Sequence, residues 1–314
     1  MKHTTFAVFV LSFAFHSMVY AQGAGIEWEI FNQETMDLYR AARYDQAIVV
    51  GQNALKVAEQ NAGVNHPDVA TSLNNLATIY KTQGAYAKAE PLYKRSLAIR
   101  EKALGAEHPD VATSLNNLAL LYDSQSDYTN AEPLLKRSLA IFEKALGSEH
   151  PNIATSLNNL ASIYNSQSDY AKAEPLYKRS LAIREKVLGG EHPDVVVSLN
   201  NLAFLYQTQG EYAKAEPLYK RSLAIREKAL GAEHPDVVVS LNNLAFLYQT
   251  QGEYAKAEPL YKRSLAIREK ALGAEHPNVA ASLENLAALY RATKRDTDAE
   301  VLEQRALMIR AIKR

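Results

Sequence analysis

Six regularly spaced histidines are the first candidates for chemistry in this sequence. Each begins a His-Pro-Asp or His-Pro-Asn tripeptide, and successive copies lie 42 residues apart. They are His66, His108, His150, His192, His234 and His276. A zinc ion needs several ligands at about 2.0–2.2 Å, whereas neighbouring helices pack about 8–10 Å apart. We therefore predict no metal site, and expect each histidine to pack or hydrogen-bond at the junction between repeats.

No motif typical of catalysis accompanies the histidines. The sequence contains no H-E-x-x-H, no G-x-x-x-x-G-K-[ST] and no G-x-S-x-G, which are patterns of metalloproteases, phosphate-binding loops and α/β-hydrolases. It also contains no cysteine, which excludes disulfides and thiol chemistry. A catalytic site needs unlike residues in one constellation, whereas 192–233 and 234–275 are identical. We predict a protein that is not an enzyme, with no catalytic residues and no cofactor.

The charge balance argues against two classes of partner. Lys plus Arg and Asp plus Glu are equal, at 35 each, so the formal net charge is zero. An internal repeat such as 192–233 is neutral as well, and no repeat carries a stripe of basic residues. Because nucleic acids and anionic membrane surfaces bind basic patches, we expect neither of them as a partner.

Each repeat carries two helical patterns. In the repeat 192–233, Leu199, Leu202 and Tyr206 recur at steps of three and four residues, the spacing of an amphipathic helix. Pro193 suits the first turn of this helix, because the N–H that proline lacks has no partner there. The pattern predicts one helix in the first half of every repeat.

A second helix is expected after Gly210, which separates the two patterns. Its apolar face carries Ala215, Leu218, Tyr219, Ser222, Leu223 and Ile225. Gly231 is the left-handed residue expected directly after this helix. One helix pair cannot bury its apolar stripe alone, so neighbouring pairs must stack and share a continuous core. The sequence therefore predicts an all-α array.

The 42-residue period divides the chain into segments. They are a signal peptide (1–21), a degenerate N-terminal helix pair (22–65), five repeats (66–107, 108–149, 150–191, 192–233 and 234–275) and a C-terminal repeat that acts as a cap (276–314). Trp28 is expected to cover the open end of the core. Ser126 and Ser168 replace the turn glycine in two repeats. If that position needs a positive φ, these turns are less favourable by up to ~1 kcal/mol.

The leader favours export from the cytoplasm. Lys2 provides a positive start, 6–15 is nearly all apolar, and Val19-Tyr20-Ala21 is a suitable cleavage site. The apolar stretch is short for a membrane span. We expect cleavage near Ala21 and a periplasmic or extracellular mature protein that is not inserted in the membrane. An uncleaved anchor is the alternative.

The repeat LNNLAxLY…QGxYxxAEPLYKRSLAIREKxLGxxHPD resembles the tetratricopeptide repeat, in the 42-residue form found in kinesin light chains. The resemblance covers nearly all of the chain after the leader. It implies a right-handed superhelical solenoid of antiparallel helix pairs, in which the first helix of each pair lines a concave groove that binds peptides. The heptad stretch that joins kinesin light chains to their heavy chains is absent, so a motor subunit is not indicated.

The candidate site is a double row of asparagines on the first helices. The second asparagine of the pair recurs in all six repeats as Asn75, Asn117, Asn159, Asn201, Asn243 and Asn285. The first recurs in five repeats as Asn74, Asn116, Asn158, Asn200 and Asn242. An asparagine carries a donor and an acceptor, so such a row can pair with an extended peptide backbone. The resemblance implies the same role, and structural bridges between helices are the alternative.

Selectivity would come from the variable positions of the same helices. Phe204 and Phe246 would form an aromatic stretch in an otherwise polar groove, unless they pack against adjacent repeats. Gln207 and Thr208 are also expected to face the groove. Lys81 and Arg291 stand in repeats far apart, so a set that grips a carboxylate is not favoured.

The sequence therefore predicts a scaffold that binds an extended protein segment whose identity it does not reveal. The alternative is a self-assembling structural repeat protein, which the absence of a separate capping helix after Ala306, Leu307 and Ile309 favours. An enzyme is the remaining alternative, without a motif to support it.

Overall fold

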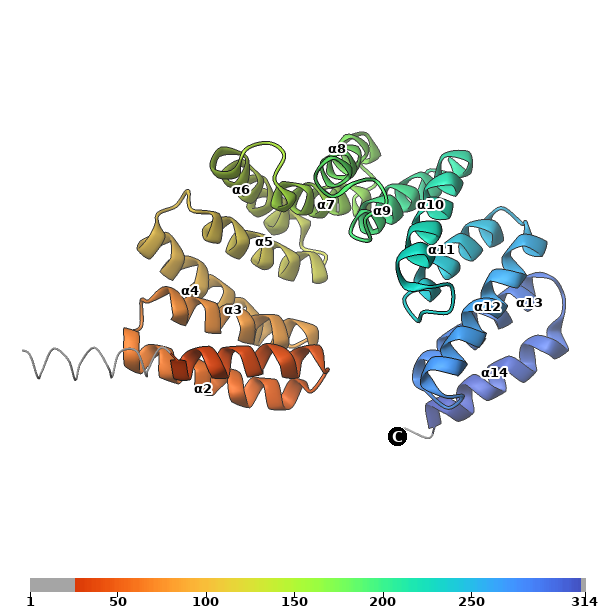
Figure 1. Cartoon of the computed structure of the whole chain (residues 1–314), viewed down its shortest axis with the longest axis horizontal. Coiled ribbons are helices and arrows are strands. Elements are labelled where there is room, and N and C mark those ends of the chain that lie inside the picture. The colour runs from red at the N-terminus through yellow and green to blue at the C-terminus, as the bar shows by residue number, and fades with distance from the viewer. Residues whose placement is uncertain (1–25, 312–314) are drawn as a thin grey trace, which may run out of the picture. The chain divides into compact units, whose positions relative to one another are not determined.

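Every element that the structure describes is an α-helix. The computed structural model describes residues 26–311, and no strand occurs within that range. A helix over residues 26–40 precedes the helices labelled α2 to α14 in Figure 1. The helices form two compact blocks, an N-terminal block that ends at Ser148 and a C-terminal block that begins at Glu149. The predicted all-α repeat array is confirmed, and the leader 1–21 lies outside the described residues.

The helices alternate between the first and the second member of a pair, which we name A and B helices. The A helices are 26–40, α3 (Pro67–Thr82), α5 (Pro109–Ser124), α7 (Pro151–Ser166), α9 (Val195–Thr208), α11 (Val237–Thr250) and α13 (Pro277–Ala292). The B helices are α2 (Tyr44–Ala62), α4 (Tyr86–Leu104), α6 (Tyr128–Leu146), α8 (Tyr170–Leu188), α10 (Tyr212–Leu230), α12 (Tyr254–Leu272) and α14 (Asp296–Ala311). Each A helix from α3 onwards packs on the B helix that follows it.

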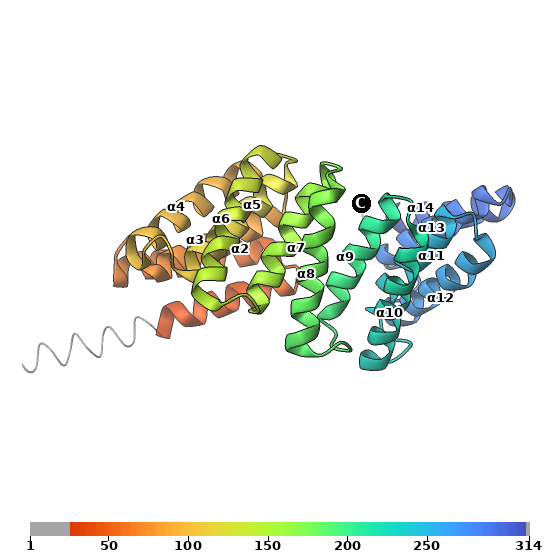
Figure 2. The same ribbon diagram turned by 90° about the horizontal axis from the view of Figure 1, so that it is seen from above.

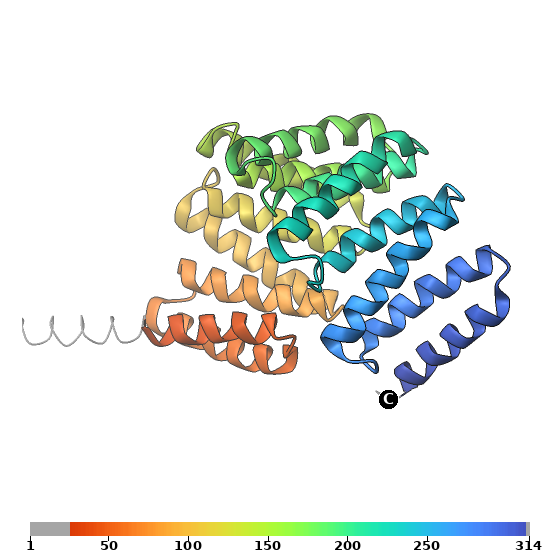
Figure 3. The ribbon, with the colours of Figure 1, turned by 45° about the vertical axis from the view of Figure 1, so that its right-hand side comes forward.

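Contacts between successive pairs continue the stack within each block. In the N-terminal block α2 contacts α3 and α4 contacts α5. In the C-terminal block α8 contacts α9, α10 contacts α11, and α12 contacts α13, as the view from above shows (Figure 2). Figure 3 shows the last pair, α13 and α14, joined by a short turn. Every helix is therefore held by its neighbours in the sequence, as in a repeat array.

The histidines of the tripeptides bond the backbone where the A helices begin, and they are the N-cap residues of α3, α5, α7 and α13. The imidazole Nδ1 of His108 accepts a hydrogen bond of 3.1 Å from the backbone N–H of Asp110, and Pro109 opens α5. The same bond, at 3.1–3.2 Å, forms at the other five histidines. It satisfies one of the backbone N–H groups that a helix start leaves without a partner. The predicted hydrogen bonding of the histidines at the repeat junctions is confirmed.

Two A helices begin later than the sequence pattern predicts. Pro193 lies before α9, which starts at Val195, and α11 starts in the same way. In α9 the N–H of Val196 bonds the carbonyl of Pro193, three residues back, whereas in α3 the N–H of Ala70 reaches His66, four residues back. The first turn of α9 and α11 is therefore tighter than an α-helical turn.

The turn between an A helix and its B helix requires a positive φ. Gly210 has φ 74°, and the serines that replace this glycine, Ser126 and Ser168, are forced to φ 58° and 61°. This conformation is costly for a residue with a Cβ atom. The turn position therefore needs a positive φ, which is the condition under which the serine turns were expected to be less favourable.

The glycine after each B helix differs from the expected left-handed residue. Gly231 has φ 91° and ψ 148°, an extended conformation of the mirror-image region that essentially only glycine adopts. Its N–H still bonds the carbonyl of Glu227. Glycine is required here as predicted, although its conformation is extended with positive φ and not left-handed helical.

The core follows both predicted stripes. Leu199 and Leu202 of α9 are buried, as are Tyr219 and Ile225 of α10. Leu223 of α10 reaches forward into the cluster of the next repeat, formed by Val237, Val238, Leu241 and Ile267. Each repeat therefore supplies a leucine to its neighbour, which makes the core continuous within a block.

The first and last described helix pairs differ from the internal repeats. Trp28 packs against the first core cluster, and its indole N–H donates a 2.8 Å hydrogen bond to Ser72. In the last pair Glu303 replaces the core tyrosine and binds Arg291 through two hydrogen bonds. Among residues 26–311, no helix is both long enough and apolar enough to cross a membrane.

Candidate peptide-binding face of the A helices

One narrow stripe of α9 reaches solvent. Val197, Phe204 and Thr208 are exposed and Asn201 is half-buried, while most of the remaining side chains of the helix are buried. These four residues are spaced by four, three and four positions, so they lie on one face of the helix. We name this face the exposed stripe. The flanking helices leave no comparable second face on α9.

The next repeat presents the same stripe again. In α11 it consists of Val239, Asn243, Phe246 and Thr250. Helix α9 contacts both α7 and α11, so neighbouring A helices lie side by side. Phe204 and Phe246 are 47% and 49% exposed, and they therefore do not pack into the core. The sequence left this question open, and the structure favours an exposed aromatic pair.

The two predicted rows of asparagines form rungs between A helices. The side-chain amide of Asn201 donates a 3.0 Å hydrogen bond to the side-chain oxygen of Asn158, and Asn117 donates to Asn74 at 2.9 Å. Asn75 donates in the same way to Asn32 of the first helix, at 2.7 Å. The second asparagine of one repeat thus holds the preceding A helix. The structural bridge considered as the alternative role exists at these three positions.

The rungs are missing between each of the two identical repeats and the repeat that follows it. The side-chain oxygens of Asn200 and Asn242 are buried without a hydrogen-bond partner. The side chains of Asn243 and Asn285, which occupy the donor positions, make no hydrogen bond to any residue that the structure describes. A buried polar atom without a partner is uncommon in folded proteins. The donor of Asn243 is therefore available on the same stripe as Phe246.

The remaining asparagines lie where the sequence placed them, on the A helices. Asn116 of α5 and Asn159 of α7 are half-buried, while Asn158 is almost fully buried. In α7 the first asparagine of the pair therefore lies deeper between helices than the second. Contact of either row with a partner stays a prediction.

Gln207 does not belong to the exposed stripe, contrary to the sequence-based expectation. It is buried, and its side-chain oxygen accepts a 3.1 Å hydrogen bond from the hydroxyl of Tyr219. Burial of that phenol raises the pKa of Tyr219. Because a buried hydroxyl needs a partner, Gln207 is bound to the core of its own repeat. Gln249 bonds Tyr261 in the same way.

Val197 and Val239 are functional candidates that the sequence analysis missed. Both are exposed, at 45% and 47%, and both replace a threonine that stands at this position in three other repeats, as Thr71, Thr113 and Thr155. The sequence signal that could have identified them is this replacement of threonine by valine in the identical repeats. Each exposed phenylalanine therefore has an exposed valine seven residues before it.

A small pocket lies at the start of the stripe between α7 and α9. It has a volume of about 240 Å³ and is lined by Pro151, Thr155, Arg184, Leu188, Asp194 and Val197. The Arg184 guanidinium donates to the carbonyl of Asp194 at 3.1 Å and to the Thr155 hydroxyl at 3.4 Å. Its charge is therefore held by the walls of the pocket rather than presented to a ligand.

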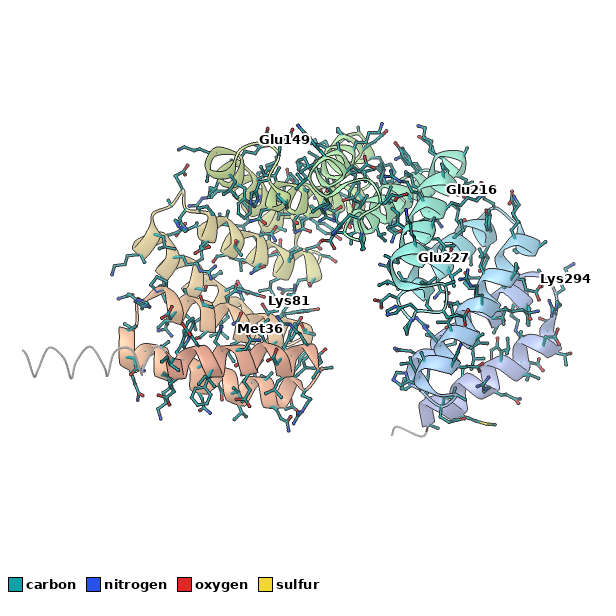
Figure 4. All side chains as sticks on the ribbon, viewed as in Figure 1. Met36, Lys81, Glu149, Glu216, Glu227 and Lys294 are labelled. Atoms are coloured by element: carbon teal, nitrogen blue, oxygen red, sulfur yellow. The ribbon has the colours of Figure 1, made fainter. Side chains whose placement is uncertain are left out.

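Charge is distributed unevenly over the A helices. The exposed stripes of α9 and α11 carry no charged residue. In the N-terminal block Lys81, labelled in Figure 4, interacts with Asp123. Burial lowers the pKa of Lys81 and raises that of Asp123, and each opposite charge acts against the shift. Arg291 is bound to Glu303 and Asp296, so it does not present a free guanidinium for gripping a carboxylate.

The charged side chains of the B helices form a separate structural network. Glu216 of α10, labelled in Figure 4, accepts a 2.9 Å hydrogen bond from the Tyr248 hydroxyl and pairs with Lys220. The hydrogen bonds from Lys220 and Tyr248 lower the pKa of Glu216. Tyr206 and Glu174 form the equivalent link at 2.9 Å. These groups join successive repeats and do not form a reactive cluster.

No metal-binding cluster of His, Asp and Glu occurs in the part of the chain that the structure describes. Each of the six repeat histidines uses Nδ1 to accept a hydrogen bond from the backbone N–H two residues later. The exposed stripes offer amide groups and apolar side chains, which are suited to binding.

The pairs of helices match one known family along nearly the whole described chain. The profile of the tetratricopeptide repeat matches residues 36–102, 83–144, 124–186, 152–228, 194–270 and 236–311. The chain belongs to the tetratricopeptide repeat family. Arrays of this family are typical of scaffolds for protein–protein interaction, and their repeats generally carry no catalytic site.

Solved structures support this assignment. A Podosopora anserina protein described as a kinesin light chain with nearly identical TPR-like repeats is 34% identical, with a TM-score of 0.57. The match covers 66% of this tetratricopeptide chain and 98% of the other. The apo form of RapI has a TM-score of 0.64 at 16% identity, covering 91% of this chain and 98% of its own. The latter likeness concerns the fold alone.

A curated relative matches only a fragment. The RxLR effector protein SFI4 of Phytophthora infestans (strain T30-4) is 34% identical over 74 residues, which is 24% of this chain. The match spans 22% of that relative's length.

Proposed function

We propose that this protein is a non-catalytic scaffold that holds an extended segment of a partner protein against the exposed stripes of its A helices. The observation that carries the proposal is the surface of α9 and α11. Most of each helix is buried, and the part that reaches solvent combines an asparagine amide with apolar side chains. A stacked array repeats such a surface along its length, which suits an extended ligand.

Binding would be the sum of many weak contacts. The side chain of Asn243 makes no hydrogen bond to any of the described residues 26–311, so it can donate to a peptide carbonyl and accept from a peptide N–H. Each such bond contributes about 1 kcal/mol, and a buried apolar anchor can contribute more. A partner therefore needs to contact several repeats for stable binding.

Two single asparagine variants test the proposal. Asn243→Ala removes an amide without a structural bond, whereas Asn201→Ala also removes the rung to Asn158. The probe is a crosslinking capture from the native compartment with the full mature protein. We expect Asn243→Ala to reduce capture several-fold with unchanged thermal stability, and Asn201→Ala to reduce both. Lys228→Ala, on the B-helix surface, is the control and should change neither.

Unchanged capture by Asn243→Ala would remove the asparagines from the binding site. Self-assembly is the second candidate, and one observation favours it. Leu307 of α14 is 66% exposed, although its counterpart Leu265 packs into the cluster of the next A helix. Sedimentation at rising concentration separates the two candidates, because a monomer at all concentrations excludes self-assembly.

A further inference from the structure

Among the A helices from α3 to α13, exposed large apolar side chains occur only in the two identical repeats. Val197 and Phe204 stand on the exposed stripe of α9, and Val239 and Phe246 stand on that of α11. At the phenylalanine position the other repeats carry Thr78, Leu120, Ser162 and Ala288. Only α9 and α11 combine an exposed valine with an exposed phenylalanine among the described A helices. We name these four residues the Val–Phe surface.

A hydrogen bond between asparagines is missing beside the Val–Phe surface. The rung that joins Asn201 to Asn158 has no equivalent between Asn243 and Asn200. The stripe in this region has amide groups and no charge. An ionised group of a ligand would lose water here without gaining a partner, which is costly. The surface therefore favours an uncharged ligand with backbone groups to offer.

The symmetry of the surface favours a chain over a second copy of the protein. The two Val–Phe pairs are related by the repeat, which displaces one A helix onto the next without reversing its direction. Pairing about a two-fold axis would require the patch to meet itself in reverse. A peptide that runs along the array meets α9 and α11 in the same sense, and so can place the same side chain on each.

The spacing of the helices sets the spacing of those side chains. Helices α9 and α11 are in contact, so their axes lie about 8–10 Å apart. A polyproline II chain rises about 3.1 Å per residue and completes a turn in three residues. Residues three apart then point the same way and lie about 9 Å apart. In a β-strand, residues that share a face lie about 7 or 13 Å apart, which fits less well.

We propose that the Val–Phe surface binds an uncharged, polyproline II-like peptide segment with two apolar side chains three residues apart. One side chain packs on Val197 and Phe204, and the other packs on Val239 and Phe246. The backbone between them remains open to the amide of Asn243, since a polyproline II chain has no internal hydrogen bonds. This inference rests on the proposed function and adds the chemistry and the register of the bound segment.

A set of synthetic peptides tests the register. The probes are fluorescent, terminally blocked ten-residue peptides of Ser, Gln and Pro that carry two leucines two, three, four or five positions apart. Binding to the full mature protein is measured by fluorescence anisotropy. We expect the three-residue spacing to bind at least tenfold tighter than the others. Replacing a residue between the leucines with Asp should lower the affinity at least tenfold.

Variants assign the binding to this surface. One double variant combines Phe204→Ser with Phe246→Ser, because the equivalent position of another repeat carries Ser162. The other combines Val197→Thr with Val239→Thr, because the equivalent position there is Thr155. Both double variants should weaken the three-residue peptide at least tenfold. Leu120→Ser changes the same position of α5 and should leave binding unchanged. All these side chains are at least partly exposed, and circular dichroism checks that each variant is folded.

Several results would overturn the proposal. They are equal binding at all spacings, full binding by either double variant, and no binding of any peptide. Self-association that the phenylalanine variant abolishes would make a second copy the occupant. If the natural partner is captured equally by the wild type and by the phenylalanine variant, the scaffold function stands and this inference fails. If Asn243→Ala and the phenylalanine variant both leave capture unchanged, both proposals fail.

Discussion

Tyr93 shows how strongly one side chain can depend on its repeat. The ring lies in the core between α3 and α4, and its hydroxyl is 2.9 Å from the hydroxyl of Thr78. Burial raises the pKa of Tyr93 to about 12, against the hydrogen bond with Thr78, which acts to lower it. An unfolded tyrosine titrates near 10. The fold therefore favours the neutral phenol.

This difference predicts a loss of stability in alkali. Because the folded pKa is above the unfolded one, the contribution is complete below about pH 10 and is lost as the pH rises towards 12. Tyr93→Phe keeps the ring and removes the ionisable group, so its alkaline unfolding midpoint should move upwards. Circular dichroism gives the midpoint, and absorbance of the tyrosinate gives the ionisation. Tyrosinate formation complete below pH 11 in the folded protein would contradict the burial argument.

The sequence predicted the residues whose role depends on periodicity. Leu199, Leu202 and Tyr206 are buried because they share the face of the helix that packs against neighbouring helices. Gln207, next to that stripe, was assigned to solvent because it is polar. Its burial depends on the hydroxyl of Tyr219, which comes from the other helix of the pair. A contact of that kind has no periodic signature.

At the scale of the element, the sequence also indicated how the helices begin and end. Histidine, proline and glycine recur at the junctions, and the structure uses all three for caps and turns. The late start of α9 and α11 was not predictable in the same way. Both helices begin with three consecutive valines, which adapt less easily to a helical first turn because they are branched at Cβ.

The rungs between asparagines show the same limit. Two neighbouring asparagines predict a polar row, but the sequence cannot show that the second one reaches back to the first one of the preceding repeat. Asn117 and Asn74 illustrate this, since they meet only when α5 packs beside α3. The side-chain oxygens of Asn200 and Asn242 have no partner although the next repeat carries the donor asparagine, so the residue pair alone does not predict a rung.

The serine turns are weak elements that can be improved. Ser126 has φ 58° where other repeats have glycine. Ser126→Gly should raise the free energy of unfolding by up to ~1 kcal/mol, because glycine adopts positive φ without a steric penalty. The reverse change, Gly210→Ser, should lower it by a similar amount. Urea unfolding of the two variants measures both effects, and a stabilising Gly210→Ser would contradict the strain argument.

At the scale of the molecule, surface ion pairs follow the array without dominating it. An arginine in each of several B helices pairs with a glutamate of the preceding B helix, as in Arg137 with Glu101 and Arg263 with Glu227. Exposed pairs of this kind contribute about 0–1 kcal/mol each and are screened by salt. The stability of each block therefore comes mainly from the apolar clusters between repeats.

Export is the remaining proposal for the whole chain. We propose that residues 1–21 direct the protein out of the cytoplasm and are removed, because they combine a lysine, an apolar stretch and a small residue before the cut. Mass spectrometry of the protein purified from its own cells should show a mature chain that begins at Gln22. A chain that retains residues 1–21 would support the uncleaved anchor.

Because α9 and α11 have the same sequence, a partner with one apolar anchor can bind at either helix. The Val–Phe pair of one repeat and that of the next offer it the same apolar contacts, so it can bind in two registers of similar energy. This degeneracy favours the bound state by about 0.4 kcal/mol, the equivalent of a twofold change in affinity. A single-anchor partner could then step from one repeat to the next without leaving the protein, and a double-anchor partner could not.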